Sequence, residues 1–311
     1  MKKIYFSFIA LSLICVMFAT ATGCGVRING KEYEFYKSSQ SEKKSNNIFN
    51  GIGSESRESQ QVKQDKIDGE ELKVSTGAGN IDIRKAGGSE IIVDADKKVR
   101  GASEDTKKTI LENMNISIEQ NGKNLDIAVR TRDGKDFWEW QKDNYKTYQI
   151  TINYDIKVPE SIKDLSVSTG AGNIIIEGQA EKVDASTGAG NIDVDDMKAE
   201  LKLSTGAGNI DIDNSSALGN CKLSTGAGNI DFMGKVEDVN GFDASTGMGN
   251  VNFRVPSDSK MSINADTGLG KLGGSFINIE GNKSHFNGDI NGGGVSIRLS
   301  TGVGNVDIDE D

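Results

Sequence analysis

Apolar and polar residues alternate along most of the chain, in short runs on either side of a repeated glycine-rich segment. The segment reads Ser-Thr-Gly-x-Gly-Asn-apolar and begins at Ser75, Ser168, Ser186, Ser204, Ser224, Ser245 and Ser300, with an altered copy at Asp266. From Ser168 onward the copies start 18, 18, 20, 21, 21 and 34 residues apart. Threonine and both glycines recur in every copy, whereas Lys271 replaces the asparagine of the altered one. A repeat of this length is typical of solenoids.

The alternation around each copy predicts two strands joined by a tight turn. Before the first copy Leu72 and Val74 are apolar and Lys73 is polar, and after it Ile81 and Ile83 stand on either side of a polar Asp82. Successive side chains of a strand point to opposite faces, so each strand would bury one face. A single unit has too few apolar residues to fold alone, and stacking in register would cover each apolar face.

The repeat therefore predicts an all-β fold, a right-handed β-solenoid (β-helix) of two parallel sheets joined by Gly-x-Gly turns. The two glycines would supply the backbone freedom of a sharp corner. Stacked threonine hydroxyls and asparagine amides would bond along columns of identical residues. The acidic residues Asp307, Asp309, Glu310 and Asp311 would place negative charge on the last coil and discourage end-to-end pairing.

Residues 84–160 interrupt the repeat and predict irregular coils. We expect a strand over 90–96, a short helix over 103–115 capped by Ser103, a hairpin over 116–130 around Asn121-Gly122, and a strand over 148–158. These strands would continue the same two sheets. The helix would cover an edge of one of them.

The first residues have the features of a secretion signal, residues 1–23. Lys2 and Lys3 precede an apolar run, Ile4 to Phe18, that is short for a transmembrane helix. The sequence Ala21-Thr22-Gly23-Cys24 resembles a bacterial lipobox, with Ala21 where leucine is usual. We expect lipidation of Cys24 and anchoring in a membrane. Ordinary cleavage after Ala21 and an uncleaved anchor are the alternatives.

Residues 24–70 are rich in Ser, Gln, Lys, Glu and Asn, which predicts a lipidated N-terminus followed by a disordered tether. The solenoid domain would then occupy residues 71–311. The formal charge of −10 includes no basic patch, so we expect no nucleic-acid partner. A membrane-anchored protein outside the cytoplasm, in the cell envelope or at the cell surface, fits this organisation.

The residue types of common active sites are scarce. The Asp of Gly206-Ala207-Gly208-Asn209-Ile210-Asp211 falls one residue late for a calcium-binding nonapeptide and is expected on the solvated strand face. The segment Gly268-Leu269-Gly270-Lys271 lacks the full phosphate-loop pattern. His285 is the only histidine, and Cys221 reads as a buried apolar residue. We expect no catalytic residue, no cofactor and no metal site, with a polysaccharide-cleaving pair of carboxylates as the alternative.

An aromatic segment inside the insertion is the candidate for ligand contact. It contains Phe137, Trp138, Trp140, Tyr145 and Tyr148. As an exposed loop it could stack on sugars or dock a partner, and packing of the loop against its scaffold is the alternative. The apolar residues between the paired glycines, such as Met248, Leu269 and Val303, form a second possible ridge, for which core filling is the expected role.

The signal, the tether and the Ser-Thr-Gly-Ala-Gly-Asn-Ile-Asp-Ile repeats over residues 70–311 resemble a bacterial family of proposed adhesins, classed as a domain of unknown function. They also resemble the head domains of autotransporter-type adhesins. The resemblance implies a β-helix without catalytic residues. We therefore expect a surface lipoprotein with a non-catalytic binding or structural role toward an unknown glycan or protein. An envelope signalling or stress accessory acting on a membrane partner is the alternative, and a polysaccharide-acting enzyme the third possibility.

Overall fold

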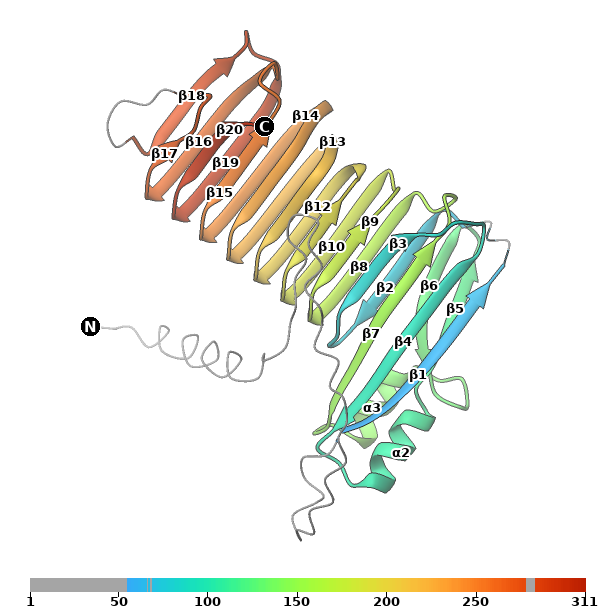
Figure 1. Ribbon diagram of the computed structural model, residues 1–311. Coiled ribbons are helices and arrows are strands. Elements are labelled where there is room, and N and C mark those ends of the chain that lie inside the picture. The colour runs from blue at the N-terminus through green and yellow to red at the C-terminus, as the bar shows by residue number, and fades with distance from the viewer. Residues whose placement is uncertain (1–54, 66, 68, 278–282) are drawn as a thin grey trace, which may run out of the picture. The chain divides into compact units, whose positions relative to one another are not determined.

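The computed structural model describes residues 55–65, 67, 69–277 and 283–311 (Figure 1). The predicted signal peptide, Cys24 and most of the predicted tether lie outside these residues. The described residues belong to one compact unit, Phe49–Asp311, and the buried core lies entirely within it. The fold is all-β and solenoid-like.

The strands that lead into the glycine-rich turns form one parallel ladder. Equivalent residues lie side by side, for example Ser168 beside Ser186 and Ser186 beside Ser204. In spatial order the ladder runs β2 (Glu71–Thr76), β8 (Asp164–Ala171), β10 (Lys182–Ala189), β12 (Lys198–Ala207), β13 (Ile210–Ala227), β14 (Ile230–Met248), β19 (Val295–Val303) and β16 (Met261–Leu269).

The strands that leave the turns form a second parallel ladder. It contains β3 (Ile81–Lys85), β9 (Ile174–Glu177), β11 (Ile192–Asp195), the first residues of β13 and β14, β15 (Val251–Val255), β20 (Val306–Glu310) and β17 (Leu272–Gly273). The strands β13 and β14 are long because each continues from this ladder into the first. The two parallel ladders correspond to the two predicted sheets, but β13 and β14 join them into one large sheet. The right-handed sense of the coil stays a prediction.

The core lies where the inward residues of the two ladders meet. Leu72, Val74, Ile81 and Ile83, the apolar residues of the first repeat, are fully buried, as the alternation predicted. The later coils have larger core residues. There Phe232, Phe242 and Phe253 pack together, with ring centroids 4.9–5.2 Å apart.

The insertion builds one end of the stack, with β4 (Ile91–Arg100), β5 (Asn115–Asn121), β6 (Asn124–Arg130) and β7 (Gln149–Val158). As expected, β6 continues the first ladder beside β2, and β7 continues the second beside β3. Beyond them the pairing becomes antiparallel, β5 with β6 and β4 with β7. The predicted helix is confirmed as α2 (Glu104–Glu112), and its cap Ser103 accepts a hydrogen bond from the Thr106 N–H. It contacts β4 and β1.

The prediction of a disordered tether through residue 70 is wrong for β1 (Glu55–Gln64), which pairs antiparallel with β4. Composition suggested disorder because β1 has few apolar residues. Its partners are instead ionic and come from β4: Arg57 Nη2 lies 2.7 Å from Asp96 Oδ2, and Lys97 Nζ lies 2.7 Å from Glu58 Oε1. The Gln60 side chain also exchanges two hydrogen bonds with the backbone of Ile116 in β5, so it joins the edges of the two ladders.

The other end of the stack is not the C-terminus of the chain. The C-terminal strand β19 lies between β14 and β16, and β20 lies between β15 and β17. The altered repeat at Asp266 is therefore the terminal coil, and β18 (His285–Ile290) pairs antiparallel with its outer edge. The prediction that the acidic C-terminal residues place negative charge on the last coil is wrong, because their strand β20 lies between β15 and β17.

Candidate functional site

In all turns but the first, both paired glycines are required by the close approach of successive coils. In Gly172, Gly190, Gly208 and Gly228 the φ angle is between 147° and 149°, a region that favours glycine. A Cβ on Gly208 would lie 2.0 Å from the Gly190 carbonyl oxygen of the neighbouring coil. The first glycine is also confined in the later turns, since a Cβ on Gly206 would lie 2.5 Å from the Gly188 oxygen, whereas a Cβ on Gly77 would meet only Trp138, at 4.0 Å. These glycines therefore serve the stack.

The threonine and asparagine of the repeat bond from coil to coil. Thr205 Oγ1 donates to the Gly190 carbonyl at 2.8 Å, and Asn209 N–H donates to Asn191 Oδ1 at 2.9 Å. The predicted amide-to-amide ladder is thus wrong in its partners: each asparagine side chain accepts from the next backbone N–H. The column begins at Asn153 of the insertion and ends at the Lys271 N–H, which donates to Asn305 at 3.0 Å. No further coil follows Lys271 among the described residues, so no asparagine acceptor is needed there.

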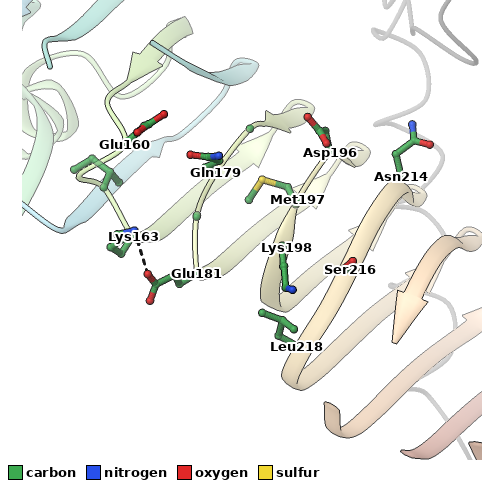
Figure 2. A pocket seen from close by; sticks show the side chains of 13 residues that line it. Glu160, Lys163, Gln179, Glu181, Asp196, Met197, Lys198, Asn214, Ser216 and Leu218 are labelled. Atoms are coloured by element: carbon green, nitrogen blue, oxygen red, sulfur yellow. Dashed lines mark ion pairs between the residues drawn. The ribbon is translucent and has the colours of Figure 1, made fainter. Parts of the chain in front are cut away.

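A groove of about 600 Å³ runs along the stack on the connections between coils (Figure 2). The short connections Gly178–Glu181 and Asp196–Lys198 lie between the 159–163 connection and the bend of β13. Its buried apolar lining comes from Ile162, Ala180 and Met197. Sequence reasoning missed this groove. The signal for it was the spacing of the repeats, which is 18 residues from Ser168 to Ser186 and to Ser204 and 20 or 21 residues after that. The shorter coils have shorter connections, and these lie lower than the longer connections on either side.

The rim of the groove has side chains of both charges. Figure 2 shows Lys163 beside Glu181, with Nζ 3.1 Å from Oε1, and Lys198 and Asn214 further along. Glu160 pairs with Lys85 at 2.6 Å, and this lysine lowers the pKa of the carboxyl. Asn214 has a φ of 49° and donates to Asp195 Oδ1 at 3.1 Å, which fixes its side chain at the corner of the coil. The lining thus presents hydrogen-bond donors and acceptors, held in place by these contacts, beside a small apolar surface.

The aromatic segment forms a helix, α3 (Phe137–Asn144), where the sequence suggested a loop. Asp136 caps it and accepts a hydrogen bond from the Glu139 N–H at 3.0 Å. Phe137 is fully buried, which excludes it from direct contact with a ligand in this structure. The half-buried rings, Trp138, Trp140, Tyr145 and Tyr148, pack on Phe137, on one another and on the core, with centroids 5.1–6.1 Å apart. This arrangement favours packing against the scaffold, and the role of the half-buried rings as ligand contacts stays a prediction.

The apolar residues at the turn tips do not fill the core. Met248, Val303 and Leu269 are 59%, 49% and 72% exposed. They occupy adjacent coils, since Val303 lies beside Met248 on one side and beside Leu269 on the other. The core-filling interpretation is wrong for these three, because the tip lies between two glycines at the outer point of the corner.

Aspartates of the second ladder stack on its outward face, as the phase of the repeat predicted. Asp193 lies beside Asp211, and Asp211 beside Asp231. They are not fully solvated. Desolvation raises the pKa of Asp193 to about 6 and that of Asp211 to about 7, and for Asp211 the neighbouring Asp193 and Asp231 charges add to the increase. None of the three lines the groove.

Other centres predicted from sequence can be placed in the described part of the chain. Cys221 is buried there, with Sγ 3.2 Å from the Leu218 carbonyl oxygen. His285 Nδ1 lies 2.6 Å from Asp266 Oδ1 at the terminal coil. Among the described residues no group of three or more His, Cys, Asp or Glu side chains is arranged to hold a metal ion. No helix in that part of the chain has the length and apolar character needed to span a membrane.

Comparison with known proteins identifies the family. The family model described as Toastrack DUF4097 matches residues 69–309, and the chain belongs to this family. This confirms the resemblance to a domain of unknown function, and the relation to autotransporter-type adhesins stays a prediction. None of the curated proteins matches the chain.

Several solved structures resemble the chain at low identity. A "putative adhesin" from Bacteroides fragilis is 14% identical, covers 82% of this chain and 97% of its own, and has a TM-score of 0.41. A "putative adhesin" from Parabacteroides distasonis is 14% identical, covers 84% and 98%, and has a TM-score of 0.37. A "putative cell adhesion protein" from Clostridium sporogenes is 17% identical, covers 83% and 100%, and has a TM-score of 0.35. Likenesses at this level carry no conclusion about function.

Proposed function

We propose that this protein is a non-catalytic binding protein, anchored outside the cytoplasm through a lipid on Cys24, and that its groove binds a glycan of the cell envelope or cell surface. The observation that carries the proposal is the groove itself. Its volume of about 600 Å³ falls in the range of small-molecule binding sites. Its rim presents amide, ammonium and carboxylate groups at successive coils, and a chain of sugar units needs such repeated polar partners.

The architecture supports binding rather than catalysis. The repeated residues are used by the scaffold, since the glycines, threonines and asparagines are held by the neighbouring coil. None of the carboxyls with a raised pKa lines the groove; they are Asp82, Asp193, Asp211, Asp213 and Asp307. A glycan-cleaving site would need two carboxyl groups that converge on one bond from a cleft. Of the groove carboxylates, Glu160 and Glu181 are paired with Lys85 and Lys163. The third, Asp196, is exposed on a turn with a φ of 54°.

The anchor rests on the sequence alone. Replacing Cys24 with alanine should release the protein from the membrane fraction into the soluble fraction while leaving its fold unchanged. Retention of the Cys24→Ala variant in membranes washed with alkaline carbonate, which removes peripheral contacts, would contradict lipid anchoring and support the uncleaved signal as the anchor.

A glycan array probed with the unit Phe49–Asp311 tests the groove. The variant Gln179→Ala/Lys198→Ala should lose about tenfold in affinity for any glycan that the unit binds, because removal of two polar contacts weakens binding by about 0.5–1.5 kcal/mol each. Its matched control is Lys182→Ala/Lys202→Ala, which changes exposed side chains of the same coils outside the groove lining.

Two outcomes would overturn the proposal. One is equal affinity of the groove variant and its control, and the other is the absence of glycan binding by the unchanged unit. If binding is instead lost in Trp138→Ala/Trp140→Ala, with the groove variant unaffected, the half-buried aromatic rings on α3 are the site.

A further inference from the structure

The turn tips change character along the stack. In five coils the residue between the glycines is alanine, at Ala78, Ala171, Ala189, Ala207 and Ala227. In the three consecutive coils at the β16 end it is Met248, Val303 and Leu269, which we call the apolar tip ridge. The alanine coils show that the scaffold accepts a methyl group at this point. The larger side chains are exposed, so packing of the core does not explain them.

Positive charge lies beside the ridge. Lys271 follows Leu269 by two residues, at the position where the other repeats have asparagine, and its exposed side chain makes no ion pair among the described residues. The Leu272 N–H donates to the Lys283 carbonyl, which brings the exposed Lys283 next to the same coil. The acidic residue of this coil, Asp266, is held by His285 at 2.6 Å. The apolar tip ridge therefore has lysines beside it, although the formal charge of the whole chain is −10.

From these features we infer that the apolar tip ridge is a membrane contact, whose three side chains enter the headgroup region of a bilayer while Lys271 and Lys283 face anionic lipid headgroups. An exposed ridge of three side chains is small for a stable protein interface, which buries roughly 800 Å² on each partner. A bilayer has no such requirement, since each apolar side chain that leaves water contributes separately. Lysines next to an anionic surface add attraction that decays within about 10 Å.

The geometry of the chain permits this contact on an anchored molecule. Along the second ladder, the stack from β1 to β17 has a length of about 50 Å, at about 4.8 Å per strand. The predicted tether between Cys24 and β1 contains about 30 residues, and a disordered segment of that length, as its composition predicts, would have an r.m.s. span of about 30 Å and a maximum near 100 Å. A solenoid anchored beside β1 can therefore reach the same membrane with its opposite end. The inference does not depend on the proposed glycan groove.

Vesicle binding by the unit Phe49–Asp311, which lacks the predicted lipid site, is the test. We expect it to sediment with phosphatidylglycerol vesicles more than with phosphatidylcholine vesicles. Met248→Ala/Val303→Ala/Leu269→Ala should reduce binding at least about tenfold while the unfolding transition is unchanged, because alanine occupies the same position in five other coils. Lys271→Ala/Lys283→Ala should reduce binding to the anionic vesicles only, by about fivefold per lysine.

A second readout separates insertion from simple adhesion. An environment-sensitive fluorophore attached to Leu269→Cys should brighten on addition of phosphatidylglycerol vesicles, whereas the same label on Ala189→Cys, at a middle turn, should not. The native Cys221 is buried and should not be labelled.

Several outcomes would overturn the inference: unchanged vesicle binding by the triple alanine variant, no vesicle binding by the unit, or equal brightening of the two labels. A dimer in light scattering that the triple variant abolishes would show that the ridge joins two copies of the chain instead.

Discussion

The middle coils and the two ends of this solenoid follow different rules. In the middle, from β8 to β14, the repeated residues of one coil lie beside the same residues of the next coil, and Asn209, for example, bonds to Asn191. At the ends the partners are unlike. Gln60 bonds to Ile116, Asn153 begins the asparagine column outside any repeat, and Lys271 ends it. Repetition therefore specifies the stack, whereas its termination depends on single residues.

Replacing a glycine of positive φ with alanine should reduce the stability of the fold by very different amounts in the two regions. We expect Gly208→Ala to destabilise the fold by roughly 3–5 kcal/mol, because backbone strain adds to the collision with Gly190 at 2.0 Å. Gly122→Ala, in the hairpin of the end structure, has a φ of 62° and open space around its Cβ. It should cost only about 1–2 kcal/mol. Urea unfolding measures both, and equal losses would contradict the coil-to-coil explanation.

The asparagine column should show the same contrast with a smaller effect. Asn209→Ala removes the acceptor of the Asn229 N–H, a 2.9 Å bond, and should cost about 1–3 kcal/mol. Lys271→Ala, at the same position of the terminal coil, should cost less than about 0.5 kcal/mol, because its side chain accepts from no backbone group in the described structure. Thermal or urea unfolding compares them. A cost at Lys271 as large as that at Asn209 would mean that the column has another role.

The aspartate ladder predicts the smallest effect, and it depends on pH. The pKa of Asp211 in the folded chain, about 7, is above its ordinary value of 3.8. Between these values the folded chain binds more protons than the unfolded chain, so this group's contribution to stability is lost as pH rises through that window. We expect Asp211→Asn to be more stable than the native chain at pH 8 by about 1 kcal/mol after solvent screening, with the gap narrowing at pH 5.

An aspartate of the first ladder supplies the control for this prediction. Asn252 lies beside Asp231, so an amide fits the ladder. Asp243→Asn changes an aspartate of the other ladder that lies between Lys222 and Arg298 rather than between two aspartates, and it should show no pH-dependent gain. If Asp211→Asn follows the pH dependence of the native chain, the aspartate ladder is as solvated as the sequence suggested.

The sequence predicted the repeating part of the fold well and the candidate sites poorly. Alternation around Ser168 to Ser245 revealed the strands, because burial of one strand face is a local property of each repeat. It also located α2 through the Ser103 cap. The groove escaped prediction because it arises from coil lengths rather than from any motif. The sequence predicted a loop where α3 forms and core positions for Met248, Val303 and Leu269. Both predictions failed because the identity of an apolar residue does not show whether other residues cover it.

By itself, the sequence determined that the chain forms stacked coils with glycine corners, since period-two alternation and a fixed repeat admit few other ways to bury apolar faces. Only the tertiary structure decided the order of the coils, which placed the C-terminal strands β19 and β20 inside the stack and made the altered copy at Asp266 its end. It also decided that the polar segment at Glu55–Gln64 is strand β1. The physical reason is that strand pairing depends on which backbone edge is free nearby, a property of the folded assembly that no local pattern records.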